Sequence, residues 1–191
     1  MELIQPIFVN QSGSTREAGL GIANSSYSQT DIIERIQKDV DLGIDSFLLF
    51  ITPDTKTWLP TWDFQAEVVN KIKNKFPTIQ LIVDVCLCST LPDGHCRVID
   101  KPDTSESLLI DLGRKLEKAG ADVLAPSDMG DHTVTNLKQE TKKEVMAYVK
   151  WRSVFYSSFR DLAESSPTSG RSYQLPVDNG FGMVATANQY K

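Results

Sequence analysis

The sequence lacks several features that would place a chain in a specialised class. Its 191 residues carry 20 lysines and arginines against 25 acidic residues, and the resulting net charge of −5 argues against a nucleic-acid or anionic membrane surface. No run of about 18 apolar residues occurs, and the N-terminal stretch MELIQPIFVN lacks the basic residues of a signal peptide. We therefore expect a cytoplasmic protein that binds neither nucleic acid nor membrane.

A glycine-rich phosphate-binding motif is also missing after the first predicted strand, so dinucleotide binding has no support. The remaining composition is ordinary, with 40% hydrophobic and 24% charged residues. A chain of 191 residues is long enough to bury a full core, and we assign residues 1–191 to a single domain.

Apolar runs and helical patterns alternate along the chain. Short runs rich in β-branched and aromatic residues predict strands at 3–9, 47–51, 80–85, 122–125 and 145–149. Helical spacing predicts helices over about 30–42, over a segment ending before Pro77, and over 105–119, 134–143 and 153–163. Residues 10–29 are rich in glycine, serine and threonine and are predicted to form a loop.

Strands that alternate with helices predict a parallel sheet built by right-handed crossovers. A doubly wound sheet and part of a (β/α)8 barrel both fit this pattern. Polar residues lie at or just past the carboxyl ends of the last three predicted strands, namely Asp84, the cysteines, Ser127, Asp128 and Lys150. Carboxyl ends form the active face of a barrel, so we favour an α/β fold, an incomplete barrel of about five β/α units.

The stretch DVCLCSTLPDGHC, residues 84–96, contains all three cysteines of the chain. Residues i and i+2 of an extended chain point to one face, and the turn at 91–94 brings Cys96 back toward Cys86 and Cys88. Three thiolates suit zinc and leave a coordination position for water or substrate. The alternative interpretation is three buried free cysteines that act as small hydrophobic side chains.

Lys150 ends the apolar strand VMAYVK. A lysine in this position is usually a solvated strand end. The functional alternative is a desolvated amine with a lowered pKa, which would attack a ketone as a Schiff-base nucleophile. Downstream, Tyr156, Arg160 and Arg171 would supply a phenol and two guanidinium groups for substrate carboxylates.

Several stretches together resemble porphobilinogen synthase, also called aminolaevulinate dehydratase. They are PIFV, DVCLC followed by DGHC, AGADVLAPSDM, and YVKWRSVFYSSFRD with ESSP and YQLP beyond it. The resemblance covers residues 3 to about 176 and leaves 176–191 as a divergent tail. It implies a (β/α)8 barrel and a lyase that condenses two 5-aminolevulinate molecules into porphobilinogen for haem and other tetrapyrroles.

The resemblance also implies roles for individual residues. The zinc ligands of the family match Cys86, Cys88 and Cys96, and the first of its two Schiff-base lysines matches Lys150. Active-face residues match Asp84, Ser127 and Asp128, and residues around the substrate and lid match Tyr156, Arg160, Arg171 and Gln174.

Departures from the family pattern bear on activity. The second Schiff-base lysine of the family lies in a Val-Lys-Pro segment, whereas the only lysine after Lys150 here is Lys191, in NQYK. Arg97 stands where a glycine usually follows the third cysteine, and serines 157–158 replace a Gly-Pro pair. We expect a C-terminally truncated barrel with uncovered strand edges, which forms a homo-oligomer or is completed by a complementing chain.

Three functions stay open at this point. The first is a porphobilinogen synthase whose missing half comes from a partner. The second is a catalytically inactive paralogue, a pseudoenzyme that binds zinc or a small ligand or serves as an interaction module. The third is a fragment without function of its own. We predict family membership, zinc as cofactor, 5-aminolevulinate as the substrate if binding is retained, and no pyrrole formation by the isolated chain.

Overall fold

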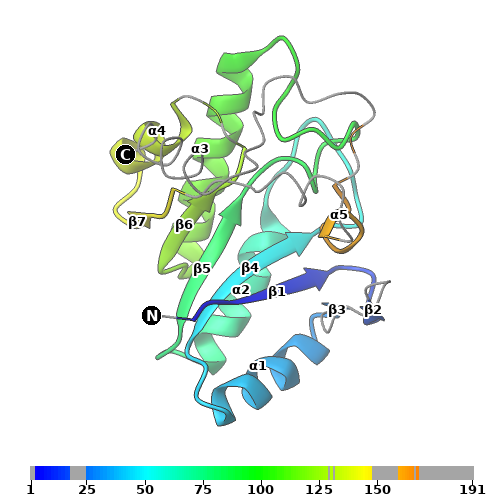
Figure 1. The fold of residues 1–191 in the computed structure, drawn as a ribbon. Helices are drawn as coiled ribbons and strands as arrows, with labels where there is room; N and C mark the ends of the chain where they lie inside the picture. Colours follow the sequence, from blue (N-terminus) through cyan, green and yellow to red (C-terminus); the bar gives the residue numbers. More distant parts are fainter. Residues whose placement is uncertain are drawn as a thin grey trace, which may run out of the picture.

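The computed structural model of the chain describes residues 3–17, 25–128, 130, 132–147, 159–165 and 167. Its strands are β1 (Gln5–Asn10), β2 (Arg16–Glu17), β3 (Ser25–Tyr27), β4 (Ser46–Thr52), β5 (Gln80–Val85), β6 (Val123–Pro126) and β7 (Glu144–Val145). Its helices are α1 (Asp31–Asp41), α2 (Asp63–Lys75), α3 (Pro102–Ala119), α4 (Thr133–Glu140) and α5 (Phe159–Leu162). These strands form one sheet in the order β2-β3-β1-β4-β5-β6-β7 (Figure 1).

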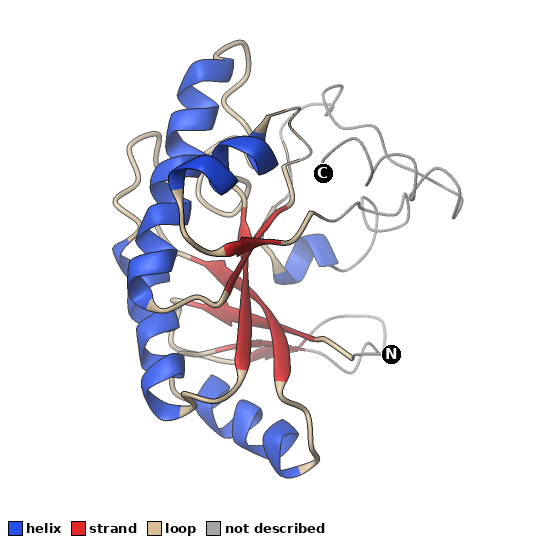
Figure 2. Ribbon diagram, turned by 90° about the vertical axis from the view of Figure 1, so that its left-hand side faces the viewer, coloured by secondary structure: helices blue, strands red, loops and turns tan. Residues whose placement is uncertain are grey.

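The strand order decides between the two predicted architectures. Strands β1, β4, β5, β6 and β7 lie side by side in chain order, and each pairs in parallel with its neighbour, while β3 and β2 extend the sheet at the other edge of β1. Helices α1 to α4 cover one face of the sheet, and α5 lies on the other (Figure 2). A doubly wound sheet would reverse its strand order and carry crossover helices on both faces. The described strands therefore form an open part of a (β/α)8 barrel, and the predicted fold class is confirmed.

Alternate side chains of the strands face opposite sides of the sheet. We call the side covered by α1–α4 the outer face and the opposite side the inner face. Leu81, Val83 and Val85 of β5 join the large core on the outer face, whereas Ile82 packs in a small cluster on the inner face. On the inner face of β1 and β4, Phe8 and Phe50 stack with ring centroids 4.9 Å apart.

The predicted loop over 10–29 contains two short strands that the sequence pattern did not reveal. β3 pairs in parallel with the end of β1, and β2 pairs antiparallel with β3. The residues of β3, Ser-Ser-Tyr, carry little hydrophobic periodicity. This strand forms because the edge of β1 offers unpaired backbone groups, which is a property of the sheet rather than of the segment.

The other elements predicted up to residue 143 agree with the structure except at their ends. Of the strand predicted over 145–149, only Val145 lies in β7, residues 146–147 belong to no strand, and 148–149 lie outside the described residues. Of the helix predicted over 153–163, residues 153–158 lie outside the described residues, and α5 covers Phe159–Leu162. β5 has the predicted bounds, and α1 stops just before Gly43, whose φ of 88° suits a helix C-terminus. α3 begins at Pro102, before the predicted start, because proline lacks an N–H that the first helical turn does not need. α4 ends at Glu140, before the predicted end, since Thr141 is extended. Among the described residues, no helix is long and apolar enough to cross a membrane.

Candidate active site

The inner face becomes polar where the parallel strands end. Asn10 closes β1, Thr52 closes β4, Asp84 is the penultimate residue of β5, and Ser127 follows β6. Asn10 and Thr52 are paired in register across neighbouring strands. A cavity at this edge is lined by Phe50, Thr52, Asp84, Cys86, Cys88 and Ser127, among others. The carboxyl ends thus gather the polar groups into one site, as the barrel interpretation predicts.

The cysteine loop, residues 86–96, leaves the sheet directly after β5 and returns to it. Its first turn is helical, because the amides of Thr90 and Leu91 both donate to the carbonyl of Leu87, at 2.9 and 2.8 Å. Its second turn closes with Gly94, whose amide donates to the carbonyl of Leu91 at 3.1 Å and whose φ is 68°. The first turn differs from our expectation of an extended chain, since β5 ends before the first cysteine.

The three cysteines nevertheless meet. The Sγ atoms of Cys86 and Cys88 lie 3.3 Å apart, and all three Sγ atoms, including that of Cys96, lie within 4.8 Å of one another. Sulfurs bound to one tetrahedral ion at about 2.3 Å lie about 3.8 Å apart. The cluster can therefore hold a single metal ion after a small adjustment of its side chains.

Burial determines the proton state of this cluster. All three thiols are buried, and burial raises the pKa of Cys86 well above its usual range, with further increases from Cys88 and Cys96. The metal-free thiol of Cys86 is therefore protonated at neutral pH. A metal ion must displace protons to bind here, so the affinity for metal rises with pH.

Asp128 lies next to the cluster and is also buried, with 1% of its surface exposed. One carboxylate oxygen accepts hydrogen bonds from the hydroxyl of Thr133 at 2.8 Å and the amide of Gly130 at 3.2 Å. Burial raises the pKa of Asp128 to about 6, and the electrostatic interaction with Cys96 acts in the same direction, while the Thr133 hydrogen bond, the Arg97 charge and the Gly130 hydrogen bond oppose it. A carboxyl group with this pKa can gain or lose a proton near neutral pH.

Arg97 places a positive charge beside this carboxylate. Its Nε lies 3.8 Å from Asp128, and its Nη2 lies 3.5 Å from Glu106. Gly130 makes room for the guanidinium group, because a Cβ atom on Gly130 would lie 2.4 Å from Nη1 of Arg97. The Arg97 guanidinium is thus packed beside the buried carboxylate of Asp128 and against Gly130.

The α5 segment covers part of the inner face. Leu162 and Ala163 pack against Phe8 and Phe50, and Ala163 also lines the cavity. Arg160 is buried there, and its Nη1 donates a hydrogen bond to the hydroxyl of Ser165 at 3.1 Å.

Four predicted site residues lie outside the described part of the chain, namely Lys150, Tyr156, Arg171 and Gln174. The structure brings together Asp84, Ser127, Asp128 and the three cysteines, and it buries Arg160 in the α5 segment. The catalytic and substrate-binding roles of all these residues stay predictions.

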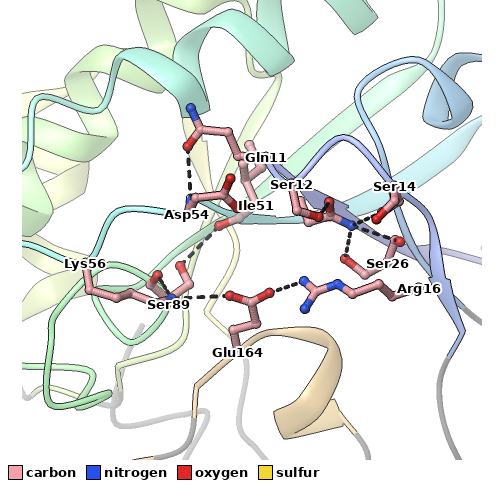
Figure 3. Close-up of polar contacts among 11 residues, drawn as sticks. Gln11, Ser12, Ser14, Arg16, Ser26, Ile51, Asp54, Lys56, Ser89 and Glu164 are labelled. Carbon is pink, nitrogen blue, oxygen red and sulfur yellow. Dashed lines mark hydrogen bonds and ion pairs between the residues drawn. The ribbon is translucent and has the colours of Figure 1, made fainter.

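Sequence reasoning missed Asn10 and Thr52, although the rule about carboxyl ends would have found both if applied to the first two strands. It also missed Lys56, whose Nζ donates to the carbonyl of Ser89 and whose pKa is lowered by burial. Glu164 was missed as well, and its carboxylate pairs with Lys56 (Figure 3). No local signal marks either residue, because their partners are distant in the sequence.

Comparison with known proteins gives one consistent result. The sequence model of the family described as Delta-aminolevulinic acid dehydratase matches residues 1–189. Proteins of that name from Halalkalibacterium halodurans and Dictyostelium discoideum are 32% and 33% identical to the chain over 93% and 96% of its length. The matches cover 60% and 63% of those two proteins, so the chain spans about three fifths of their length.

A solved structure agrees with these matches. It is the delta-aminolevulinic acid dehydratase (porphobilinogen synthase) of Toxoplasma gondii, in complex with its reaction product porphobilinogen. The chain superposes on it with a TM-score of 0.85 and 26% identity, covering 98% of the chain and 60% of that protein.

Proposed function

Because the chain belongs to the Delta-aminolevulinic acid dehydratase family, we propose that it provides the metal-binding and substrate-binding face of a porphobilinogen synthase. The reaction joins two 5-aminolevulinate molecules into porphobilinogen and releases two molecules of water. The main support for this proposal is the arrangement of the cysteine cluster. Three cysteine sulfurs within 4.8 Å of one another adjoin a cavity that Asp84 and Ser127 also line.

The proposed cofactor is zinc, held by Cys86, Cys88 and Cys96. The donor set supports this choice, because soft thiolates favour zinc over magnesium or calcium. The chain contains no fourth cysteine, so the proposed site leaves a coordination position for water or substrate. When bound, zinc would supply Lewis-acid polarisation of a substrate carbonyl or amine.

The remaining proposed roles belong to side chains. The Lys150 amine attacks the ketone carbon of one substrate, and the carbinolamine then loses water to form an imine. The guanidinium of Arg160 binds the substrate carboxylate. Asp84, at the cavity wall, orients the substrate amine, and Asp128, with a pKa of about 6, exchanges a proton during the condensation.

Full turnover needs an anchor for the second substrate as well. The resemblance implies a second Schiff-base lysine in a Val-Lys-Pro context, and the sequence around Lys191 does not share that context. We propose that this lysine comes from another part of the complete enzyme or from a second chain that completes the barrel. The 191-residue chain alone should then bind one substrate covalently without forming the pyrrole.

The test combines a pyrrole assay with chemical trapping. We would incubate the purified chain with zinc and 5-aminolevulinate, measure porphobilinogen colorimetrically, reduce the mixture with borohydride and determine the intact mass. The proposal predicts one substrate adduct and no pyrrole. The adduct should disappear in Lys150→Ala and persist in the matched control Lys142→Ala, which removes an exposed lysine.

Each outcome has a defined meaning. A substantial rate of pyrrole formation by the chain alone would overturn the need for a second lysine from elsewhere. No adduct in the unsubstituted chain would overturn the substrate-binding proposal. An adduct that survives Lys150→Ala would assign the Schiff base to a different lysine.

A further inference from the structure

Glu164 joins segments that are far apart in the sequence. Its carboxylate forms an ion pair with Arg16, which begins β2 and is 148 residues away, and a second ion pair with Lys56, at 3.7 Å. Lys56 in turn donates a hydrogen bond to the carbonyl of Ser89, the residue after Cys88 (Figure 3). The Glu164 carboxylate therefore connects the α5 segment directly to β2 and, through Lys56 in the loop between β4 and α2, to the cysteine loop.

The backbone of Glu164 is unusual for a residue with a side chain. Its φ is 45°, in the left-handed region, and it follows the end of α5. The amide of Ser165 donates to the carbonyl of Arg160 at 3.1 Å, which closes the helix end as in a Schellman motif. Glycine is the usual residue at such a position because it adopts positive φ without strain. A glutamate there indicates that its side chain serves a purpose apart from the turn.

The two ion pairs are too exposed to be important for global stability. The side chains of Arg16, Lys56 and Glu164 are 44%, 28% and 27% exposed. Pairs with this exposure are screened by salt and contribute little to the stability of a fold. Any effect of these pairs is therefore local, on the segment that carries Glu164.

The α5 segment carries groups of the proposed site. Ala163, adjacent to Glu164, lines the cavity, and Leu162 packs with it on Phe8 and Phe50. Arg160, the proposed carboxylate-binding residue, is buried in the same segment. A shift of α5 would therefore move the cavity wall and the guanidinium group together.

We infer that Glu164 is a positioning residue, which fastens α5 to the sheet through Arg16 and to the cysteine loop through Lys56. It thereby holds Arg160 at the distance from the metal site that the substrate requires. The part of this inference that concerns substrate rests on the proposed function, whereas the fastening of α5 does not.

Hydrogen exchange measured by mass spectrometry tests the fastening directly in the full chain. Glu164→Gly is the informative variant, because glycine adopts the positive φ without strain while the whole side chain, with its carboxylate, is removed, and Glu164→Gln removes the charge alone. We expect exchange across residues 159–165 to become roughly tenfold faster in Glu164→Gly and Glu164→Gln, and about fivefold faster in Lys56→Met. The matched control is Glu140→Gln, which removes a comparable ion pair to Arg114 on the outer helices and should leave this segment unchanged.

Salt provides a second readout on the same sample. Raising the ionic strength from about 0.05 M to about 1 M should accelerate exchange of residues 159–165 in the unsubstituted chain, because it screens the two pairs. The same change should have little effect in Glu164→Gly, which has no pair left to screen. Unchanged exchange in Glu164→Gly would show that Leu162 and Ala163 hold α5 without help, and would overturn the inference.

Ligand binding then tests whether Glu164 positions α5 alone or supports the whole site, including the cysteine cluster. We expect Glu164→Gly to weaken 5-aminolevulinate binding about tenfold while zinc affinity stays within about twofold. Loss of zinc affinity in that variant would make Glu164 a support of the whole site and would overturn its assignment as a positioning residue. If the unsubstituted chain binds no 5-aminolevulinate, the proposed function fails, and the exchange data alone decide whether Glu164 fastens α5.

Discussion

The two faces of the sheet differ in what holds them together. The outer face packs against four helices in one continuous apolar core, which includes Ile7, Phe47, Leu81, Leu109 and Leu116. The inner face has only small apolar clusters among the described residues, and it carries the cysteine cluster and the buried Asp128 at its carboxyl-end rim. The outer face therefore provides most of the apolar packing, whereas buried positions at the rim of the inner face hold thiol and carboxyl groups.

This division explains why polar residues are tolerated at the rim of the inner face. A buried carboxyl or thiol is costly unless it is hydrogen-bonded or neutral, and both solutions occur there. Asp128 accepts hydrogen bonds and has a raised pKa, and the raised pKa of Cys86 keeps its thiol neutral. The comparison predicts that substitutions on the inner face change ligand binding first, whereas those on the outer face change stability first.

The largest expected effect comes from removing one sulfur of the proposed metal site. Cys96→Ser should lower zinc affinity on the order of 1,000-fold, because the serine hydroxyl is a much weaker zinc ligand than a thiolate. The free energy of unfolding of the metal-free chain should change by less than about 1 kcal/mol, since serine fills nearly the same volume. Competition with a chromogenic chelator measures the first quantity, and urea unfolding with excess chelator measures the second. Equal zinc affinity in both proteins would contradict the three-cysteine site.

A core substitution on the outer face should lower stability and leave zinc affinity unchanged. Leu109→Ala removes a fully buried side chain of α3 and should lower the free energy of unfolding by about 3 to 4 kcal/mol. Leu162→Ala on the inner face should cost roughly half as much, because the apolar cluster around it is small and loses fewer contacts. Urea unfolding of both variants checks the ratio. A larger loss for Leu162→Ala would reverse the proposed division between the faces.

The buried carboxyl group of Asp128 should make stability depend on pH. Its folded-state pKa, about 6, lies above the ordinary 3.8, so folding favours the protonated form. The stabilisation is therefore complete below about pH 4 and is lost as the pH rises through about 6, by at most roughly 3 kcal/mol. The measurement is urea unfolding of metal-free chain and of Asp128→Asn at several pH values. As the pH rises through about 6, the free energy of unfolding of the unsubstituted chain should fall relative to that of Asp128→Asn. A difference between the two proteins that does not change with pH would contradict the raised pKa of Asp128.

The smallest expected effect is at the opposite edge of the sheet, where the strands begin. Lys73 pairs with Asp122 at 2.7 Å, and this carboxylate also accepts the amide of Leu81 at 2.8 Å. Lys73→Met should lower the free energy of unfolding by about 1 kcal/mol, because the pair is partly exposed. Zinc affinity should stay the same. In barrels, ligands bind at the carboxyl ends of the strands, whereas residues at the amino ends contribute to stability. A change in zinc affinity would show that the two edges are coupled.

The sequence alone was sufficient for most of the fold of the described residues and for the cysteine cluster. The bounds of β5, the end of α1 before Gly43 and the alternation of strands and helices all follow from local patterns. The cysteine cluster was predicted because its three members lie within eleven residues around a recognisable turn. These features are local, so the chain encodes them in neighbouring residues.

Contacts between distant segments were decided by the tertiary structure. The pairing of β3 with β1, the packing of Arg97 over Gly130 and the ion pairs of Glu164 all join segments that no periodic pattern relates. Each depends on where the sheet places the ends of its strands and on which side chains remain near them. Local periodicity specifies the elements of this protein, whereas the rim of the inner face is specified by the geometry that results when those elements pack together.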